Sequence, residues 1–318
     1  MKKIAIVVVL AVFLSCFAII DTVKAEFPKK PITFMIYTKP GGLADVTARK
    51  IIAIAAKYTD ATFVALNKPG AGGIVAMKAI LQGKTDGYTI LMATMSNIAK
   101  VVTSKGDVNL DDFTWLAMLV SDAECIITNK TQEINTWEQL AEDAKAKAGK
   151  QIWVGPAAGG RDHIMAMKVW ENTGITAKWI PYASGGKAMA ALLGGHGVAY
   201  VGNPLDTVGK PDLKVAIISR EERLKQFPDA PTFKELGVEG LDNEIMWRGI
   251  VVKNGTDPDA LAFYADLFQK VAKDPEWIEF LGKGGADAVY YGPDKFSEIA
   301  KQNAEEFTTY LKKIGVLK

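Results

Sequence analysis

Two stretches that run from apolar residues through closely spaced glycines into a helical pattern constrain the fold most. In the first, residues 32–37 are largely apolar, Lys-Pro-Gly-Gly follows at 39–42, and residues 48–56 carry an apolar stripe at helical spacing. In the second, an apolar run over residues 62–66 leads through Asn-Lys-Pro-Gly-Ala-Gly-Gly at 67–73 into another helical stripe. Each stretch predicts a strand, a turn and a helix. Two in succession predict a parallel sheet whose helix N-termini share one edge.

These glycine turns have the chemistry of an anion site. Glycine has no Cβ and accepts positive φ, so backbone N–H groups can approach a ligand closely. A helix that begins at such a turn adds unpaired N–H groups and the positive end of its dipole. Asp45 falls in the first turn of the first helix, where its carboxylate either suits the dipole or fixes a ligand group. A single glycine turn is more often only a tight turn, whereas the pair favours a binding site.

The later chain continues the same plan. A further apolar run over residues 89–93 leads to Ser96 and Asn97, which either cap the next helix or face a ligand. In the second half, glycine turns at residues 156–160 and 182–186 again separate predicted strands from predicted helices. The fold class is therefore α/β, with two similar lobes.

Capping patterns predict where several helices begin. Thr136 with Gln139, and Thr232 with Glu235, have the spacing of a capping box. Asp257 and Asp274 each precede a proline, which is typical of a cap followed by the first helical residue. We expect a helix at each of these four positions, the second of them ending at Gly237.

Three apolar runs are candidates for the segments that cross between the lobes. Residues 115–120 and 125–128 have no helix between them, and residues 246–252 form a return crossing. No low-complexity linker separates the two halves, which is typical of domains that share crossing strands. We expect lobe one to comprise residues 26–124 and 247–318, lobe two to comprise residues 125–246, and the ligand cleft to lie between them.

The N-terminus predicts export. Lys2 and Lys3 precede an apolar run over residues 4–20, and Val23-Lys24-Ala25 has the small-residue pattern of a signal-peptidase site. We expect a signal peptide over residues 1–25, cleaved after Ala25, and a periplasmic mature chain. A retained membrane anchor is the alternative, for which the apolar run is rather short.

Charge and composition exclude several classes of function. The full chain has 38 basic and 36 acidic residues, and cleavage after Ala25 removes three basic residues and one acidic residue, which leaves no net charge. No basic domain appears, so neither nucleic acid nor an anionic membrane is expected as a partner. The mature chain has one cysteine, Cys125, in an apolar context, so it forms no internal disulfide and is expected to be a buried thiol.

Catalytic and cofactor signatures are weak. His163 and His196 are the only histidines, and no carboxylates cluster at metal-ligand spacing, so no metal site is expected. Ser184 lacks the first glycine of a nucleophile elbow. The second glycine turn matches half of a dinucleotide-binding fingerprint, but Val75 replaces its third glycine. We expect no cofactor.

Ordered motifs along the chain resemble one family. They are Pro40-Gly41-Gly42 with Asp45, the glycine turn at 67–73, Asp86-Gly87-Tyr88-Thr89, Leu193-Gly194-Gly195, Pro228 with Pro231-Thr232, and Trp247 with Gly249. The chain resembles the extracytoplasmic solute receptors of tripartite tricarboxylate transporters, the Bug-type binding proteins, over essentially the whole mature chain.

The resemblance implies a periplasmic, non-enzymatic, monomeric receptor of the Venus-flytrap type. It implies a small organic acid as ligand, membrane permease subunits as partners, and binding largely by backbone amides of the glycine turns. The implied ligand-binding residues are Pro40, Gly41, Gly42, Asp45, Gly70, Ala71, Gly72 and Gly73 in lobe one, and Gly159, Gly160, His163, Ser184 and Gly185 in lobe two. Lys39, Ser96, Arg161, Asn203 and Trp247 complete the candidate set.

Some basic residues depart from the family pattern, among them Lys68, which stands where arginine is common. Lys39 stands where an apolar or small residue is usual, and Arg161 where a small residue is frequent. One hypothesis is that Lys39 or Arg161 faces a second carboxylate, which favours a dicarboxylate ligand. The alternative is that each reaches solvent from the rim, as long basic side chains usually do.

Two other functions remain open from the sequence. An exported enzyme would need an acid–base pair, which the motifs do not reveal. A receptor that reports to a two-component sensor instead of a permease would have the same sequence features.

Overall fold

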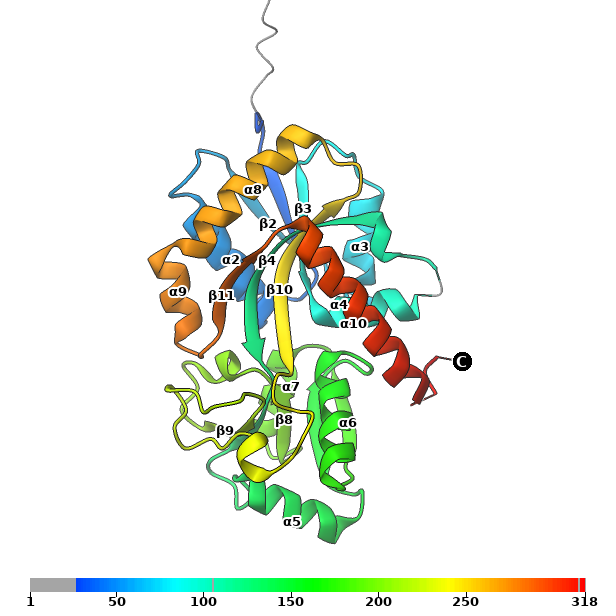
Figure 1. The fold of residues 1–318 in the computed structure, drawn as a ribbon, viewed down its shortest axis with the longest axis vertical. Helices are drawn as coiled ribbons and strands as arrows, with labels where there is room; N and C mark the ends of the chain where they lie inside the picture. The colour runs from blue at the N-terminus through cyan, green and yellow to red at the C-terminus, as the bar shows by residue number, and fades with distance from the viewer. Residues whose placement is uncertain (1–26, 105, 314, 318) are drawn as a thin grey trace, which may run out of the picture.

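The chain folds into two lobes, each built on one β-sheet (Figure 1). This computed structural model describes residues 27–104, 106–313 and 315–317. The signal peptide predicted for residues 1–25 lies outside these ranges. The two-lobed α/β class predicted from the sequence is confirmed.

The sheet of lobe one combines parallel and antiparallel strands. Its strands are β1 (Ile32–Ile36), β2 (Phe63–Asn67), β3 (Thr89–Thr94), β4 (Phe113–Ala123), β10 (Ile245–Lys253) and β11 (Asp287–Tyr291), in the order β11-β4-β10-β3-β1-β2. β1 pairs with β2 and β3 in parallel, as expected for successive strand–turn–helix units, whereas β10 is antiparallel to both β3 and β4. The carboxyl ends of β1, β2 and β3 therefore meet at one edge.

Lobe two has a smaller sheet of the same mixed kind. Its strands are β5 (Cys125–Asn129), β6 (Ile152–Pro156), β7 (Lys178–Tyr182), β8 (Ala199–Gly202) and β9 (Leu213–Ile218), in the order β7-β6-β8-β5-β9. β6 is parallel to β7 and β8, and β5 is antiparallel to its neighbours. Cys125 begins β5 and is a buried free thiol, as predicted.

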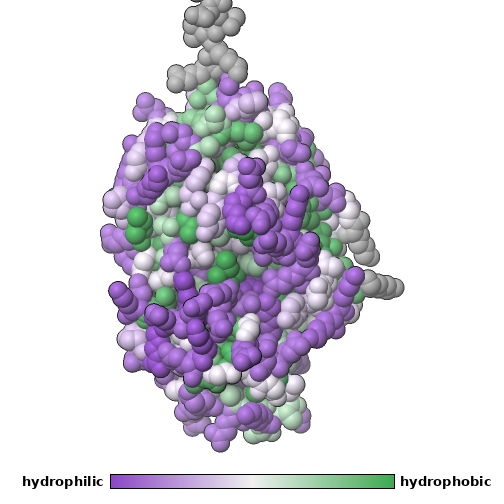
Figure 2. Space-filling view, viewed as in Figure 1, coloured by the Kyte–Doolittle hydropathy of each residue, from purple (hydrophilic) through white to green (hydrophobic). Residues whose placement is uncertain are grey.

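Helices cover both sheets. In lobe one they are α2 (Leu43–Ala55), α3 (Ile74–Leu81), α4 (Met95–Thr103), α8 (Pro258–Lys273), α9 (Pro275–Gly282) and α10 (Pro293–Lys313); in lobe two they are α5 (Trp137–Lys147), α6 (Arg161–Thr173) and α7 (Gly185–Leu193). In the described part of the chain, no helix combines the length and apolarity needed to cross a membrane. The face drawn in Figure 2 is mostly hydrophilic, with apolar residues scattered over it.

Three of the four predicted caps begin α-helices. The side chain of Thr136 accepts a hydrogen bond from Gln139 N, and Asp257 and Asp274 cap α8 and α9 in the same way. The helix predicted after Thr232 is wrong, because only one 3₁₀ turn forms at Lys234–Leu236. Gly237, at φ +71°, reverses the backbone immediately after that turn.

Two long strands join the lobes. β4 has eleven residues and β10 has nine, and they run side by side from lobe one toward lobe two (Figure 1). A single residue, Glu124, separates β4 from β5. On the side of these strands that faces α10, Trp247 packs edge to face on Trp115 and Phe296, with ring centroids 5.9 and 4.9 Å away. This aromatic cluster anchors the crossing strands to α10.

Candidate ligand cleft between the lobes

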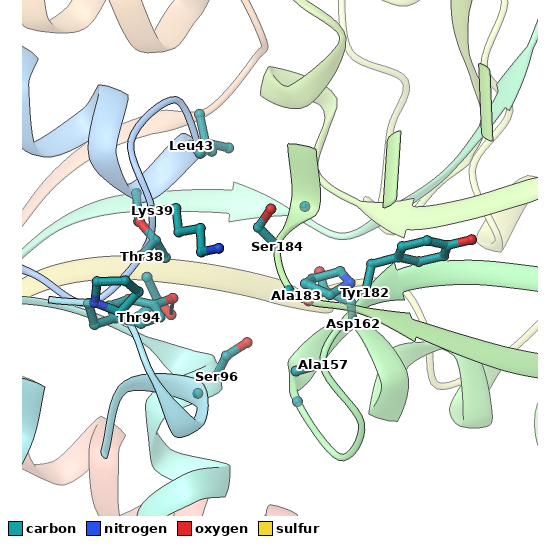
Figure 3. A pocket seen from close by; sticks show the side chains of 18 of the residues that line it. Thr38, Lys39, Leu43, Thr94, Ser96, Ala157, Asp162, Tyr182, Ala183 and Ser184 are labelled. Carbon is teal, nitrogen blue, oxygen red and sulfur yellow. Dashed lines mark hydrogen bonds between the residues drawn. The ribbon is translucent and has the colours of Figure 1, made fainter. Parts of the chain in front are cut away.

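A cavity of about 440 Å³ lies between the lobes. Lobe one contributes the end of β1, the two glycine turns and the start of α4, and lobe two contributes the turns after β6, β7 and β8. Met246 and Arg248 on β10 also line the cavity. Figure 3 shows Thr38, Lys39 and Thr94 on one side and Asp162, Tyr182 and Ser184 on the other. The cleft is large enough for a small organic molecule.

Helix N-termini from both lobes converge on this cleft. Gly42, Thr94, Gly160 and Ser184 are the N-caps of α2, α4, α6 and α7, and all four line the cavity. Gly42 and Gly160 have no side chain to accept hydrogen bonds from the first-turn N–H groups. The dipoles of all four helices favour an anion in the cleft, as do those first-turn N–H groups from which no side chain accepts a hydrogen bond.

The second glycine turn needs glycine for steric reasons. Gly73 has φ +108°, and a Cβ there would lie 2.4 Å from Nδ2 of Asn97. That amide donates to Gly72 O at 3.1 Å, while Asn97 Oδ1 accepts from Thr94 N at 2.8 Å. Asn97 therefore completes the capping box of α4 with Thr94, which is the capping role considered for it, and ties the turn to the N-terminus of that helix.

Asp45 holds the first glycine turn in place and does not line the cavity. Its carboxylate accepts hydrogen bonds from Gly41 N at 3.0 Å, Arg49 Nε at 3.0 Å and Asn67 Nδ2 at 2.8 Å. Burial acts to raise the pKa of Asp45, but the hydrogen bonds from Arg49, Gly41 and Asn67 hold it below its usual value. Asp45 is thus an ionised positioning group that joins the first turn to β2.

Arg248 reaches the cleft from the crossing strand β10. It is 3% exposed, donates to Asp122 Oδ2 at 3.1 Å and to Asn203 Oδ1 at 2.8 Å. Asn203 Nδ2 donates in turn to Ala123 O at 2.9 Å. These bonds connect β10 to β4 and to the turn after β8. Arg248 therefore holds together the segments that line the cleft where β4 and β10 cross between the lobes.

Two buried aspartates of lobe two also line the cleft. Asp206 accepts hydrogen bonds from the Tyr200 hydroxyl at 3.1 Å and from Asn203 N at 3.2 Å. Asp162, in the first turn of α6, is 4% exposed. Burial raises the pKa of Asp162 to about 7, and the negative charge of Asp206 acts in the same direction.

Contacts across the cleft join the glycine turn of lobe two to α4. Arg161 N donates to the Ser96 hydroxyl at 3.2 Å, and Lys100 Nζ donates to Ala158 O at 2.7 Å.

His163 Nδ1 accepts from Gly159 N at 3.0 Å, and its ring stacks on Trp179 with centroids 4.9 Å apart. Burial lowers the pKa of His163 to about 4, helped by the charge of Lys100, so the ring is neutral at pH 7.

Comparison with known proteins identifies the family of this chain. The family model described as tripartite tricarboxylate transporter family receptor matches residues 47–316. The chain belongs to this receptor family.

The receptor has relatives in sequence and in structure. A protein of Cupriavidus necator described as "UPF0065 protein in gbd 5'region" is 27% identical over 298 residues, which cover 92% of this chain and 90% of that protein. The structure of periplasmic binding protein BugD is 24% identical, with a TM-score of 0.82, covering 91% of this chain and 99% of that one. MatC from Rhodopseudomonas palustris, solved with bound malate, is 20% identical, with a TM-score of 0.79, covering 88% and 98%.

Ten of the eighteen candidate ligand-binding residues line the receptor's cleft. They are Lys39, Gly42, Gly70, Ala71, Gly72, Ser96, Gly160, Ser184, Gly185 and Asn203. Pro40, Gly41, Asp45, Gly73, Gly159, Arg161, His163 and Trp247 do not line it. Of the latter, Gly41, Asp45, Gly73, Gly159 and His163 belong to the turns or contact them.

Arg161 and Trp247 lie elsewhere for clear physical reasons. The Arg161 side chain is 1% exposed and forms ion pairs with Glu124, Glu244 and Glu306, so its guanidinium faces three carboxylates of the protein. Trp247 is fully buried, and its Nε1 donates to Asn303 Oδ1 at 2.7 Å. Of the two cations considered for a second ligand carboxylate, only Lys39 lines the cleft.

Several cleft residues were missed from the sequence. The side chains that matter most for charge and hydrogen bonding are Tyr37, Thr38, Lys100, Asp162, Tyr182, Tyr200, Asp206 and Arg248. Arg248 had a usable signal, because it is a cation inside an otherwise apolar strand. Asp162 and Asp206 follow the Gly160 and Asn203 turns closely, but only tertiary structure brings them to one cavity. In the described part of the chain, no group of three or more metal-ligating side chains forms.

Proposed function

We propose that this receptor captures a small organic carboxylate in the cleft between its lobes and delivers it to the permease subunits of a tripartite tricarboxylate transporter. The observation that carries the proposal is the convergence of four helix N-termini on one cavity that both lobes line. A carboxylate there would accept charge-assisted N–H bonds of about 1.5–3 kcal/mol each. A few such bonds and closure of the lobes suffice for micromolar affinity.

Two further observations support a carboxylate. Among the described residues, none pairs with the Lys39 ammonium, and Figure 3 shows this side chain extending into the cleft. The hydroxyl oxygen of Thr38 is buried in the cleft wall and has no hydrogen-bond partner in the described structure. A ligand carboxylate would satisfy both groups. MatC, which shares the fold, was solved with malate, a dicarboxylate.

The finer features of the function belong to the same proposal. We propose that the receptor has no enzymatic activity, acts in the periplasm after removal of residues 1–25, and works as a monomer. We also propose residues 26–124 and 247–318 as lobe one and residues 125–246 as lobe two.

A thermal-shift screen of the mature protein tests the carboxylate ligand. The screen compares mono-, di- and tricarboxylates, aromatic acids and amino acids with their neutral amides. A ligand at one hundred times its Kd adds about 2.7 kcal/mol to the free energy of unfolding, which shifts Tm by several degrees. We expect one class of acid to give this shift and its amide to give none. If no acid shifts Tm, or if amides act as well as acids, the proposal is wrong.

A further inference from the structure

The cleft contains one buried carboxylate whose only hydrogen-bond donor among the described residues is its own backbone N–H. Asp162 is 4% exposed and lines the cavity, yet no other described residue forms an ion pair or hydrogen bond with its carboxyl group. An acidic residue in the first turn of a helix is ordinarily exposed to water, which solvates its charge. A single N–H bond leaves most acceptor sites of a carboxylate unused, and burying such an under-satisfied charge costs free energy. This carboxylate is therefore suited to a donor that enters with the ligand.

The cations nearest to Asp162 are committed to other carboxylates. Arg161 pairs with Glu124, Glu244 and Glu306, as described above. Arg248 pairs with Asp122 at 3.1 Å and donates its other nitrogen to Asn203. Among the described residues, the side chain of Asp206, whose negative charge acts on Asp162, accepts hydrogen bonds from two neutral donors, Tyr200 and Asn203 N, and forms no ion pair. The lobe-two wall of the cleft therefore has an excess of negative charge.

The two walls of the cleft thus have opposite chemistry. The lobe-one wall offers the Lys39 ammonium, the Thr38 hydroxyl and the N-terminus of α2. The lobe-two wall offers the carboxylate of Asp162, and Figure 3 shows these two sets on opposite sides. A ligand with only negative groups would satisfy the first wall and leave Asp162 either protonated or repelled. A ligand that also has a cationic donor would satisfy both walls.

We propose that the ligand is a zwitterionic amino carboxylate, whose carboxylate binds at the lobe-one turns and whose ammonium group pairs with Asp162. This inference rests on the proposed function and narrows its ligand class. The excess negative charge on the lobe-two wall favours an ammonium group over a hydroxyl group, because only the former neutralises it. Asp162 is then a specificity-determining residue.

Isothermal titration of the mature protein with matched trios of acids tests the inference. Each trio differs by one substituent: succinate, malate and aspartate; glutarate, 2-hydroxyglutarate and glutamate; propionate, lactate and alanine. The titrations are done at pH 8, because burial raises the pKa of Asp162 to about 7 and the carboxyl must be ionised. We expect the amino acid of at least one trio to bind at least tenfold more tightly than its plain and hydroxy partners.

Variants separate the role of Asp162 from a general effect of charge. Asp162→Asn keeps the shape of the side chain and should weaken the amino acid at least tenfold while changing the plain acid by less than threefold. Asp162→Ser provides a second test if the asparagine variant folds poorly. Asp212→Asn removes the same charge from an exposed position of lobe two and should change neither affinity.

The outcomes distinguish this inference from the function on which it rests. If plain or hydroxy acids bind as tightly as amino acids, or if Asp162→Asn leaves a preference for the amino group unchanged, the ammonium subsite is wrong and the carboxylate receptor stands. If no acid of any trio binds the wild-type protein, the inference is wrong, and the thermal-shift screen described above decides separately whether the carboxylate receptor stands.

Discussion

At the scale of single residues, burial gives Asp162 a charge state that depends on pH in the physiological range. Its pKa is raised to about 7, first by burial and then by Asp206, against the opposing hydrogen bond from its own backbone N–H and the charges of Arg161 and Arg248. A carboxyl whose pKa is higher in the folded than in the unfolded state stabilises the fold when protonated. This contribution is complete below about pH 4 and is lost as pH rises toward 7.

The replacement Asp162→Asn removes this titration. It should therefore remove the contribution of Asp162 to the pH dependence of the free energy of unfolding. Without added ligand, we expect the free energy of unfolding of the variant, minus that of the wild type, to increase by roughly 2 kcal/mol from pH 5 to pH 7. Urea denaturation at several pH values measures the difference. Asp122, whose pKa burial also raises to about 7, stays in both proteins and cancels. A difference that is constant over this range would contradict the assignment.

Arg161 is expected to act on stability, since its guanidinium lies among three carboxylates of the protein. Removing one partner of a buried ion pair leaves an uncompensated charge and costs about 3–5 kcal/mol. We expect Arg161→Ala to lower the free energy of unfolding by that amount in urea titrations. Arg223 forms an exposed pair with Glu235, so Arg223→Ala is the control and should lower the free energy of unfolding far less than Arg161→Ala. Equal losses for both variants would contradict the buried network.

At the scale of elements, the second glycine turn is rigid because α4 packs against it. Gly73→Ala would force a Cβ onto Nδ2 of Asn97 at a backbone φ that disfavours side chains. We expect a loss of at least about 1 kcal/mol in the free energy of unfolding, together with weaker ligand binding. Gly186 is the matched control, because it lies in the first turn of α7 with open space around it.

The control variant should behave in the opposite way. Gly186→Ala places alanine at an ordinary helical position and should raise the free energy of unfolding by about 0.5–1 kcal/mol. Urea titrations of both variants, followed by ligand titration, measure the contrast. If Gly73→Ala is tolerated as well as Gly186→Ala, the turn does not need the conformation described above.

At the scale of the whole molecule, α10 extends from lobe one to α6 of lobe two (Figure 1). Lys168 on α6 pairs with Glu306 on α10 and with Glu244 at 2.8 Å, next to the Lys313–Glu171 pair. The Lys168–Glu306 and Lys313–Glu171 pairs join the two lobes and therefore favour the arrangement in which the lobes are close. Reversing the charge at Glu306 would place a positive charge beside Lys168 and Arg161. The repulsion between these cations should favour a more open arrangement of the lobes.

Small-angle scattering of Glu306→Lys tests this coupling between the lobes. We expect a larger radius of gyration without added ligand and a weaker ligand affinity, because binding then includes the cost of closure. Glu305→Lys changes the same charge at the exposed neighbouring position and should change neither quantity. Unchanged scattering and affinity for Glu306→Lys would show that these pairs do not influence closure.

Local patterns predicted most of the elements, and tertiary contacts decided the site. The units β1–α2, β2–α3 and β6–α6 follow from apolar periodicity and glycine turns, which are local signals. The chemistry of the cleft depends on Arg248, Asp162 and Asp206, which come from three separate segments. Arg161 is the opposite case. Its position after a glycine turn predicted a ligand contact, but the fold surrounds its guanidinium with carboxylates from distant segments of the chain.

The most direct test of the account is a crystal structure of the mature protein with the acid that binds most tightly in the screen. We expect the ligand between the lobes, with a carboxylate within hydrogen-bond distance of backbone N–H groups in the turns at residues 39–44 or 69–72. A carboxylate bound away from these turns, or a ligand bound outside the cleft, would contradict the account.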